Sequence, residues 1–303
     1  GNTVVLKPAE LTPLTALRLG ELAREAGIPE GVLQVVPGKG SVVGERFVTH
    51  PAVRKIVFTG STDVGKQIMA GCSRQVKRLT LELGGKSANI VFDDVDLAAV
   101  AAAAPAGAFD NAGQDCCARS RVLVQERIFD RFLELLQPHV TGLDTGDPRA
   151  QGTQMGPLIS AAQRDRVAGF VSEEEVAFRG KAPEGPGFWF PPTVLTPAPG
   201  SRALSEEIFG PVAPVIPFDT EEEVTRLAND TPWGLVGYLF TQDVDRGFRM
   251  GEALEVGMVG LNTGIVSNPA APFGGVKASG LGHEGGYRSI DFYTCLLYTS
   301  PSP

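Results

Sequence analysis

The chain has 303 residues, of which 43% are hydrophobic and 20% are charged, and its mean hydropathy is +0.03. These values fit a soluble globular protein of two domains, or of one domain and a large part of another. No apolar run approaches the length that spans a bilayer. The formal net charge is −8, and no cluster of Lys and Arg is dense enough to hold a nucleic-acid backbone. Membranes and polyanions are therefore not expected partners.

The first 61 residues alternate predicted strands with predicted helices. Thr12 and Pro13 form an N-cap and first-turn pair for the first helix. The strands are expected at 3–7, 32–36 and 55–58, and the helices at 14–27 and 41–50. This βαβαβ order predicts a parallel sheet with right-handed crossovers, which is half of a doubly wound nucleotide-binding fold.

Two glycine-containing turns follow predicted strands. Gly60 and Ser61 lie where a strand turns into a helix, and free N–H groups at a helix start favour a pyrophosphate. Gly38, Gly40 and Gly44 give GxGxxxG, which differs from the GxGxxG dinucleotide fingerprint. Taken singly, either turn is typical of any α/β protein.

The pattern repeats after residue 85 with new elements. Strands are expected at 88–92, 121–125, 210–218 and 237–241, and helices at 126–136 and 221–230, with an Ala-rich helix that ends at 108. The sequence therefore predicts a second α/β domain.

The four cysteines are Cys72, Cys116, Cys117 and Cys295. They lack the CxxC spacing of a zinc site, and adjacent cysteines rarely bridge each other. We therefore predict no metal site and no disulfide, and we expect a reducing cytoplasm.

Both ends of the chain are unusual. It opens without Met inside a predicted strand, so we expect that an upstream segment is missing. Residues 295–303 break the preceding pattern and resemble the translation of a sequencing-library adapter. We expect this segment to be a non-native tail; the alternative is a native, poorly ordered one.

Few residues can support acid–base or nucleophilic chemistry. The three histidines, His50, His139 and His283, lie in unrelated contexts, which argues against a Cys–His or Ser–His–Asp hydrolase. Glu82 is the lone acid in the apolar run "LTLELGGKS". Burial there would raise its pKa toward that of a useful base. The alternative is an acid at the solvent edge of a strand.

Seven motifs in order resemble the aldehyde dehydrogenase superfamily. They are "KPAE" (7–10), "FTGS" (58–61), "LELGGKS" (81–87), "NAGQDC" (111–116), "EEIFGPV" (206–212), "NDTPWGL" (229–235) and "PFGGVKASGLG" (272–282). The resemblance implies an α/β fold with part of a Rossmann-type cofactor domain and an α/β catalytic domain. It implies domain bounds of 1–84 for the cofactor part, 85–284 for the catalytic domain and 285–294 for the start of an oligomerisation arm.

The resemblance also implies the reaction. Cys116 matches the family's nucleophile and Glu82 its general base. The thiolate attacks an aldehyde, hydride passes to the nicotinamide, and Glu82 activates the water that hydrolyses the thioester. Relatives that pass the acyl group to coenzyme A do not need this base, so Glu82 favours hydrolysis. Cys117 is expected to point away from Cys116, because successive side chains alternate in an extended segment.

Cofactor contacts are carried over in the same way. Glu10 accepts from a free 2′-hydroxyl and repels a 2′-phosphate, which favours NAD, with NADP possible. For Lys7 and Glu10 a solvated charge pair is the alternative, and for Phe209 a core position. The implied cofactor-binding residues are Lys7, Glu10, Gly60, Ser61, Gly84, Glu207 and Phe209.

The substrate is less well defined by the residues. Residues 261–286 look closest to succinate-semialdehyde dehydrogenases, in which Ser267 would match a residue that binds the substrate carboxylate. Those enzymes place an arginine shortly before the nucleophile, and this chain has Asp110 there. An acid repels a carboxylate and favours an amino-aldehyde, so we predict an aldehyde without naming it.

Two further expectations come from the resemblance. The family's oxyanion asparagine lies upstream of residue 1, so we expect this chain alone to be inactive and the whole protein to be an active homodimer or homotetramer. Two rivals of another class are a catalytically dead family member that serves as a binding protein and a cysteine hydrolase without cofactor. The retained pair of Cys116 and Glu82 argues against the first, and the lack of a histidine partner argues against the second.

Overall fold

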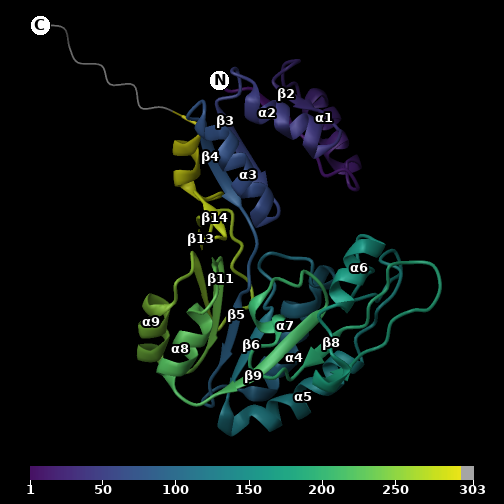
Figure 1. The fold of residues 1–303 in the computed structure, drawn as a ribbon, viewed down its shortest axis with the longest axis vertical. Helices are drawn as coiled ribbons and strands as arrows, with labels where there is room; N and C mark the ends of the chain where they lie inside the picture. Colours follow the sequence, from purple (N-terminus) through teal and green to yellow (C-terminus); the bar gives the residue numbers. More distant parts are fainter. Residues whose placement is uncertain (295–303) are drawn as a thin grey trace, which may run out of the picture.

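The computed structural model describes residues 1–294, and the predicted non-native tail and Cys295 lie outside them (Figure 1). Within this range no helix is long and apolar enough to cross a membrane. The first part of the chain contains β1 (Val4–Leu6), α1 (Leu14–Glu25), β2 (Leu33–Val35), a π-helical turn (Gly40–Gly44), α2 (Glu45–Thr49), β3 (Lys55–Thr59), α3 (Thr62–Ser73) and β4 (Arg78–Glu82).

The remaining elements follow in order. They are β5 (Ala88–Val91), α4 (Leu97–Phe109), β6 (Arg121–Gln125), α5 (Phe129–Thr141), α6 (Ala161–Ala168), β7 (Val176–Arg179), β8 (Thr193–Leu195), α7 (Arg202–Ser205), β9 (Val212–Phe218), α8 (Glu221–Asn229), β10 (Trp233–Gly234), β11 (Val236–Phe240), α9 (Val244–Ala253), β12 (Met258–Leu261), β13 (Val276–Lys277) and β14 (Gly280–Leu281).

The N-terminal elements form two small sheets instead of the one sheet that the sequence predicts. β1 and β2 pair in parallel across α1, as expected. β3 pairs with β4 and not with β2, and β14 from the far end of the chain adds antiparallel to β4. The prediction of a single βαβαβ sheet is therefore wrong, because β3 finds its partner in the strand that follows it. Helix α1 begins at Leu14 with Pro13 as its N-cap, one residue later than predicted.

The larger unit is a seven-stranded sheet in the order β12-β11-β5-β6-β9-β8-β7, in which only β7 is antiparallel to its neighbour. Adjacent residues of β6 face opposite sides of it. Val122 and Val124 join the core beneath α4 and α5, and Leu123 joins the core beneath α8 and α9. Figure 1 shows these helix pairs on either side of the strands. The predicted second α/β unit is confirmed.

The two units are joined through a continuous buried segment, because residues 80–92 are all buried. It comprises the end of β4, the connection 83–87 and β5. Ser279, two positions after β13, fastens the connection: its hydroxyl donates to the Gly84 carbonyl at 2.7 Å and accepts from Gly234 N–H at 3.0 Å. Three of the sequence motifs therefore meet at one buried serine.

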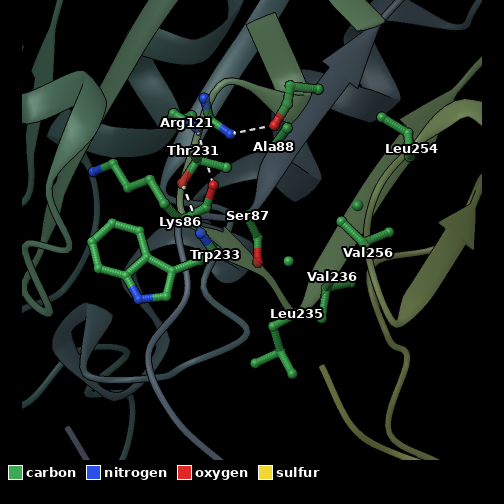
Figure 2. A pocket seen from close by; sticks show the side chains of 13 residues that line it. Lys86, Ser87, Ala88, Arg121, Thr231, Trp233, Leu235, Val236, Leu254 and Val256 are labelled. Carbon is green, nitrogen blue, oxygen red and sulfur yellow. Dashed lines mark hydrogen bonds between the residues drawn. The ribbon is translucent and has the colours of Figure 1, made fainter. Parts of the chain in front are cut away.

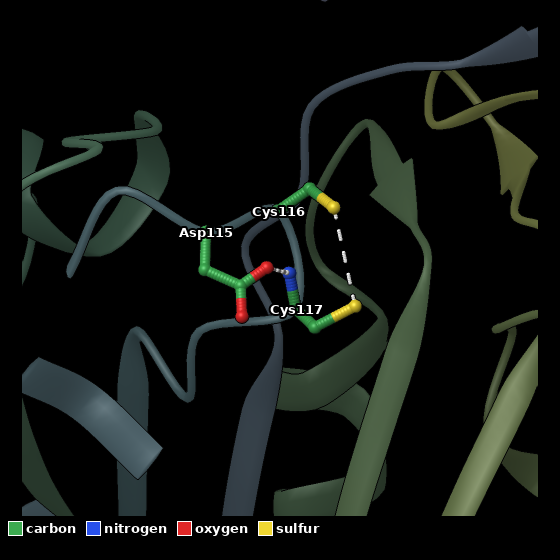
Figure 3. Close-up of side chains that lie close together, drawn as sticks. All are labelled: Asp115, Cys116 and Cys117. Carbon is green, nitrogen blue, oxygen red and sulfur yellow. Dashed lines mark hydrogen bonds between the residues drawn. The ribbon is translucent and has the colours of Figure 1, made fainter. Parts of the chain in front are cut away.

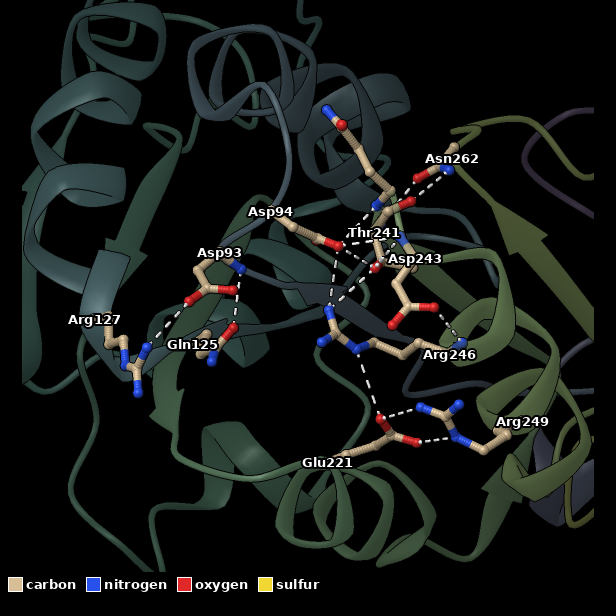
Figure 4. Close-up of polar contacts among 11 residues, drawn as sticks. Asp93, Asp94, Gln125, Arg127, Glu221, Thr241, Asp243, Arg246, Arg249 and Asn262 are labelled. Atoms are coloured by element: carbon tan, nitrogen blue, oxygen red, sulfur yellow. Dashed lines mark hydrogen bonds and ion pairs between the residues drawn. The ribbon is translucent and has the colours of Figure 1, made fainter.

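A polar network closes the ends of β5 and β11. Asp94 Oδ2 accepts from the Thr241 hydroxyl at 2.8 Å and from Arg246 at 3.3 Å (Figure 4). Asn262 follows β12, and its side chain both donates to Thr241 O and accepts from Thr241 N–H. The start of the loop that carries Ser267 is thereby fixed to the sheet.

Arg121 fixes the start of β6 to the connection 83–87. Its side chain is buried beside Lys86 (Figure 2) and donates to three backbone carbonyls, those of Lys86, Leu227 and Ala228, at 2.8–3.0 Å. Among residues 1–294 no other side chain donates to these three carbonyls, so they would lose this partner if the guanidinium were removed. Buried acceptors without a hydrogen bond are destabilising.

We expect Arg121→Ala to lower the free energy of unfolding by about 3 kcal/mol or more, since three charge-assisted hydrogen bonds are lost in the interior. Urea unfolding followed by circular dichroism measures the change. Arg131→Ala is the matched control, because Arg131 pairs with Glu134 on the surface, and its removal should change stability by less than about 0.5 kcal/mol. Equal effects of the two substitutions would contradict the prediction.

Candidate active site

The loop with the predicted nucleophile leaves α4 through a strained turn. Asn111 and Ala112 have φ of 50° and 55°, and the Asp110 carboxylate accepts from Asn111 N–H at 2.9 Å. Gly113 has φ of 68°, and a Cβ there would lie 2.2 Å from the carbonyl oxygen of Gly210. The "NAGQ" motif therefore bends so that its glycine contacts the "EEIFGPV" motif directly.

Cys116 and Cys117 place their sulfur atoms on the same side of this loop (Figure 3), 3.9 Å apart. Both are half-buried against Leu235, Val236 and Tyr238, and the Tyr238 hydroxyl donates to Cys117 O at 3.0 Å. The expectation that Cys117 points away is wrong, because the two residues form a turn and the alternation of side chains holds only for extended backbone. The contact with Cys116, together with burial, raises the pKa of the Cys117 thiol.

The glycine pair after Glu82 brings the predicted base to this loop. A Cβ on Gly85 would lie 2.5 Å from the backbone oxygen of Cys116. Glu82 is 2% exposed, and neither of its carboxylate oxygens has a hydrogen-bond partner in the described chain. Burial, with a smaller contribution from the charge of Glu284, raises the pKa of Glu82 to about 7. The alternative of an acid at a solvent edge is therefore wrong.

Glu207 reaches the same glycine pair from the opposite side. Its Oε1 accepts from Gly85 N–H at 2.8 Å, and a Cβ on Gly84 would lie 2.6 Å from its Oε2. Phe209 has φ of 57° and is 38% exposed, so it does not occupy a core position. Helix α6 supports this segment, since Gln163 donates to Phe209 O and Arg166 donates to Glu207 O, both at 2.7 Å.

Lys86 is a site residue that the sequence analysis did not single out. It is 2% exposed, and its Nζ has no hydrogen-bond partner within residues 1–294. Burial, followed by the charge of Arg121, lowers the pKa of Lys86 to about 7, while Glu207 and Glu206 oppose the shift. The sequence signal that could have identified Lys86 is its position directly after the glycine pair.

Lys7 and Glu10 gather around the Gly38–Gly40 turn. Glu10 Oε1 accepts from Gly40 N–H at 2.9 Å, and Lys7 Nζ donates to Pro8 O at 2.6 Å. Lys7 and Glu10 make no ion pair with each other in the described part of the chain. The Gly38–Gly40 turn therefore contacts Glu10, whereas the turn at Gly60 contacts Glu82.

Gly60 and Ser61 lie between β3 and α3, next to the predicted base. Gly60 N–H donates to Glu82 O at 3.0 Å, and the Ser61 hydroxyl caps α3 by accepting from Val64 N–H at 3.4 Å. The start of α3 is thus tied through one hydrogen bond to the strand end that carries Glu82.

Ser267 lies in the loop after β12. Its side chain is exposed and makes no hydrogen bond to a described residue, although the preceding Val266 packs against the cluster that includes both cysteines. The structure therefore brings this loop to the cysteines without a direct contact from Ser267.

Arg119 is a second residue that the sequence analysis did not single out. It is 6% exposed, and its Cζ lies 5.2 Å from the Tyr238 ring centre and 5.9 Å from that of Phe240. Its Nε has no hydrogen-bond partner, and no acidic side chain pairs with it among residues 1–294. A Cβ on Gly264 would lie 1.8 Å from its Nη2, so Arg119 points at the loop that leads to Ser267.

Comparisons with known proteins find semialdehyde dehydrogenases among the chain's relatives. The chain is 46% identical to the NADP(+)-dependent succinate-semialdehyde dehydrogenase of Escherichia coli (strain K12), over 98% of this chain and 63% of that protein. It is 44% identical to the glutarate-semialdehyde dehydrogenase of Pseudomonas aeruginosa, with the same coverage. The chain thus spans about three fifths of the length of these relatives.

A solved structure has the same fold. PnpE from Pseudomonas sp. WBC-3, in complex with nicotinamide adenine dinucleotide, matches with a TM-score of 0.93 and 42% identity, over 97% of this chain and 62% of that one. The family model described as "Aldehyde dehydrogenase family" matches residues 1–297. This chain therefore belongs to the aldehyde dehydrogenase family.

Proposed function

We propose that the whole protein oxidises an aldehyde to a carboxylic acid, with Cys116 as nucleophile, Glu82 as general base and NAD(P) as hydride acceptor. One observation carries this proposal. Glu82 is a buried carboxylate without hydrogen bonds, its pKa is raised to about 7, and the glycine pair beside it touches the backbone of Cys116. A base that titrates near neutral pH, in a segment that packs against the backbone of the nucleophile, suits water activation at a thioester.

The residues around the glycine pair suit a nicotinamide cofactor. Gly84 leaves open the space that a side chain would fill beside Glu207, whose carboxylate can accept from ribose hydroxyls. Gly60 and Ser61 lie at the start of α3, a helix N-terminus that favours a pyrophosphate, and Lys7 and Glu10 lie at the turn suited to the second ribose. When bound, the cofactor supplies the hydride acceptor. The free 2′-hydroxyl that Glu10 favours supports NAD, and the E. coli relative is named for NADP(+).

The chain's own residues supply the remaining steps. The Cys116 sulfur forms a bond to the aldehyde carbon, and the thiol proton passes to the carbonyl oxygen. After loss of hydride and that proton, the acyl group is held as a thioester. Glu82 then takes a proton from water, which adds to the thioester carbonyl, and the acid leaves as the Cys116 thiol is restored. No phosphate, metal or coenzyme A is required for these bonds to form and break.

Replacing Cys116 and Cys117 one at a time tests which of them is the nucleophile. We expect Cys116→Ala in the whole protein to lower kcat by at least about 10³-fold, because no covalent intermediate can form. Cys117→Ala should keep most of the activity. NAD(P)H formation from an aldehyde, followed by absorbance with NAD and NADP in turn, measures both variants. An active Cys116→Ala enzyme would overturn the proposal, as would a wild-type protein that forms no NAD(P)H.

Replacing the base tests the raised pKa of Glu82. The folded protein disfavours the charged form, so stability is fully present below the unfolded value near 4.5 and is lost as pH rises through about 7. Glu82→Gln cannot ionise. We expect it to be more stable than wild type by about 2 kcal/mol at pH 8 and equal to it at pH 4.5.

Urea unfolding at the two pH values measures this difference, and mass spectrometry of the whole protein with aldehyde and NAD(P) reports the chemistry. Glu82→Gln should accumulate the acyl-enzyme on Cys116, because hydrolysis lacks its base. Equal stability at both pH values would contradict the raised pKa, and unchanged turnover would contradict the role as base.

We further propose that the substrate carries an anionic group. The two relatives are named for succinate and glutarate semialdehyde, both of which have a carboxylate. Arg119 is a buried guanidinium without an acidic partner, and it points at the loop of Ser267. A buried charge is stabilised when an opposite charge pairs with it. Asp110 is exposed and occupied by a hydrogen bond from Asn111 N–H, so it contributes less repulsion than its position in the sequence indicates.

Arg119→Met preserves much of the side-chain volume and removes the charge. We expect KM for succinate semialdehyde to rise ten- to a hundredfold, since a hydrogen bond between charged groups contributes about 1.5–3 kcal/mol. KM for butanal, which has the same carbon chain without the carboxylate, should change less than about threefold. Steady-state kinetics of the whole protein with the two substrates decides the point, and an equal rise for both would contradict the role of Arg119.

A further inference from the structure

Three consecutive side chains at the nucleophile form a compact set of potential ligand atoms. The sulfur atoms of Cys116 and Cys117 and a carboxylate oxygen of Asp115 all lie within 4.8 Å of one another. Figure 3 shows the two sulfurs on one side of the turn, joined by the 3.9 Å contact. The prediction of no metal site rests on the missing CxxC spacing, whereas the turn at residues 116–117 brings adjacent sulfurs together.

The distance between the sulfurs matches a specific coordination geometry. Two thiolates on one tetrahedral zinc ion, each with a Zn–S distance of about 2.3 Å, have their sulfurs about 3.8 Å apart. The observed separation of 3.9 Å therefore needs no rearrangement of the turn. A Zn–O bond is about 2.0–2.2 Å long, so the carboxylate must move closer to complete the set.

The carboxylate has the freedom to do so. Asp115 is exposed, and its Oδ1 accepts from Cys117 N–H at 2.9 Å. A carboxylate oxygen has further lone pairs after accepting one hydrogen bond, so the exposed Asp115 carboxylate can also bind a cation. The turn is also rigid, because Tyr238 donates to Cys117 O and Gly85 packs on Cys116 O. A preformed turn reduces the ordering that a cation must impose.

We propose that Asp115, Cys116 and Cys117 bind one thiophilic divalent cation, such as Zn²⁺ or Cd²⁺, and that the bound cation blocks the nucleophile. Two sulfur donors and one oxygen donor favour soft or borderline cations over Mg²⁺ and Ca²⁺, which prefer oxygen. Binding forms two metal–sulfur bonds and one metal–oxygen bond, releases the two thiol protons to solvent and involves no oxidation. A water molecule can supply the fourth ligand from the exposed side.

Binding of the cation requires neither the aldehyde nor NAD(P), so its test is independent of the proposed oxidation. The whole protein is titrated with Cd²⁺ under a phosphine reductant, and the ultraviolet charge-transfer band of metal-bound thiolate is recorded. Zn²⁺ is then added in competition, and proton release is measured in weak buffer. We expect one cation per chain, a band from two thiolates, and displacement of Cd²⁺ only by an excess of Zn²⁺, because sulfur donors favour the softer cation.

Matched variants locate the site. Cys117→Ala should lose the stoichiometric band, whereas Cys72→Ala should keep it, because Cys72 is 1% exposed in the interior. Thiols other than Cys72 and Cys117 are present in both variants and contribute equally to the band of each. Cys117→Ser serves as a second variant of nearly unchanged size, and circular dichroism confirms that each variant is folded. Asp115→Asn retains the hydrogen bond from Cys117 N–H and removes the charge, so it should weaken binding and keep the sulfur band.

Two results would overturn the proposal. One is the absence of stoichiometric binding by the wild-type protein, and the other is a band that survives in folded Cys117→Ala or Cys117→Ser. If the wild-type protein also oxidises aldehydes, Zn²⁺ at the binding concentration should inhibit it, and Cys117→Ala should be less sensitive. A protein that binds the cation without oxidising any aldehyde supports the cation site and contradicts only the proposed function.

Discussion

The site depends on the absence of side chains at two consecutive positions, Gly84 and Gly85. A Cβ on the first would meet the Glu207 carboxylate at 2.6 Å, and a Cβ on the second would meet the backbone oxygen of Cys116 at 2.5 Å. Both contacts are closer than side-chain carbons approach other atoms. Ser279 binds the Gly84 carbonyl from a third segment. Four segments that are distant in the sequence therefore converge at one point, and any side chain at that point would push the Glu82 segment away from Glu207 and from the Cys116 loop.

Burial around the glycine pair also explains the shifted pKa values of two charged side chains. Glu82 and Lys86 flank the glycine pair, both are 2% exposed, and both lack hydrogen-bond partners for their charged groups among the described residues. Burial moves their pKa values toward each other, to about 7 in each case. A fold selected only for stability would place apolar side chains at both positions. Groups poised between charged and neutral forms at neutral pH are instead typical of sites that transfer protons.

Prediction from the sequence succeeded where a short-range pattern determines the structure. The strands β5 and β6 follow from continuous apolar runs, and the ordered motifs identified the aldehyde dehydrogenase family. It failed where the outcome depends on long-range partners or on a local turn. The partner of β3 depends on which strand is adjacent in space, and nothing in "KIVF" distinguishes β2 from β4. The orientation of Cys117 depends on a turn that the alternation rule does not describe.

Lys86 and Arg119 were missed for a related reason. A lysine after a glycine pair and an arginine after two cysteines are ordinary surface residues unless the tertiary structure buries them. Burial of Arg119 follows from Gly107 on α4 and Gly264 in the loop after β12, because a Cβ at either position would overlap the guanidinium. These two glycines therefore determine which charge is buried near the cysteines. They allow a cation to be buried beside Tyr238 while the acid at Asp110 remains at the surface, and the local sequence around Asp110 gives no sign of that cation.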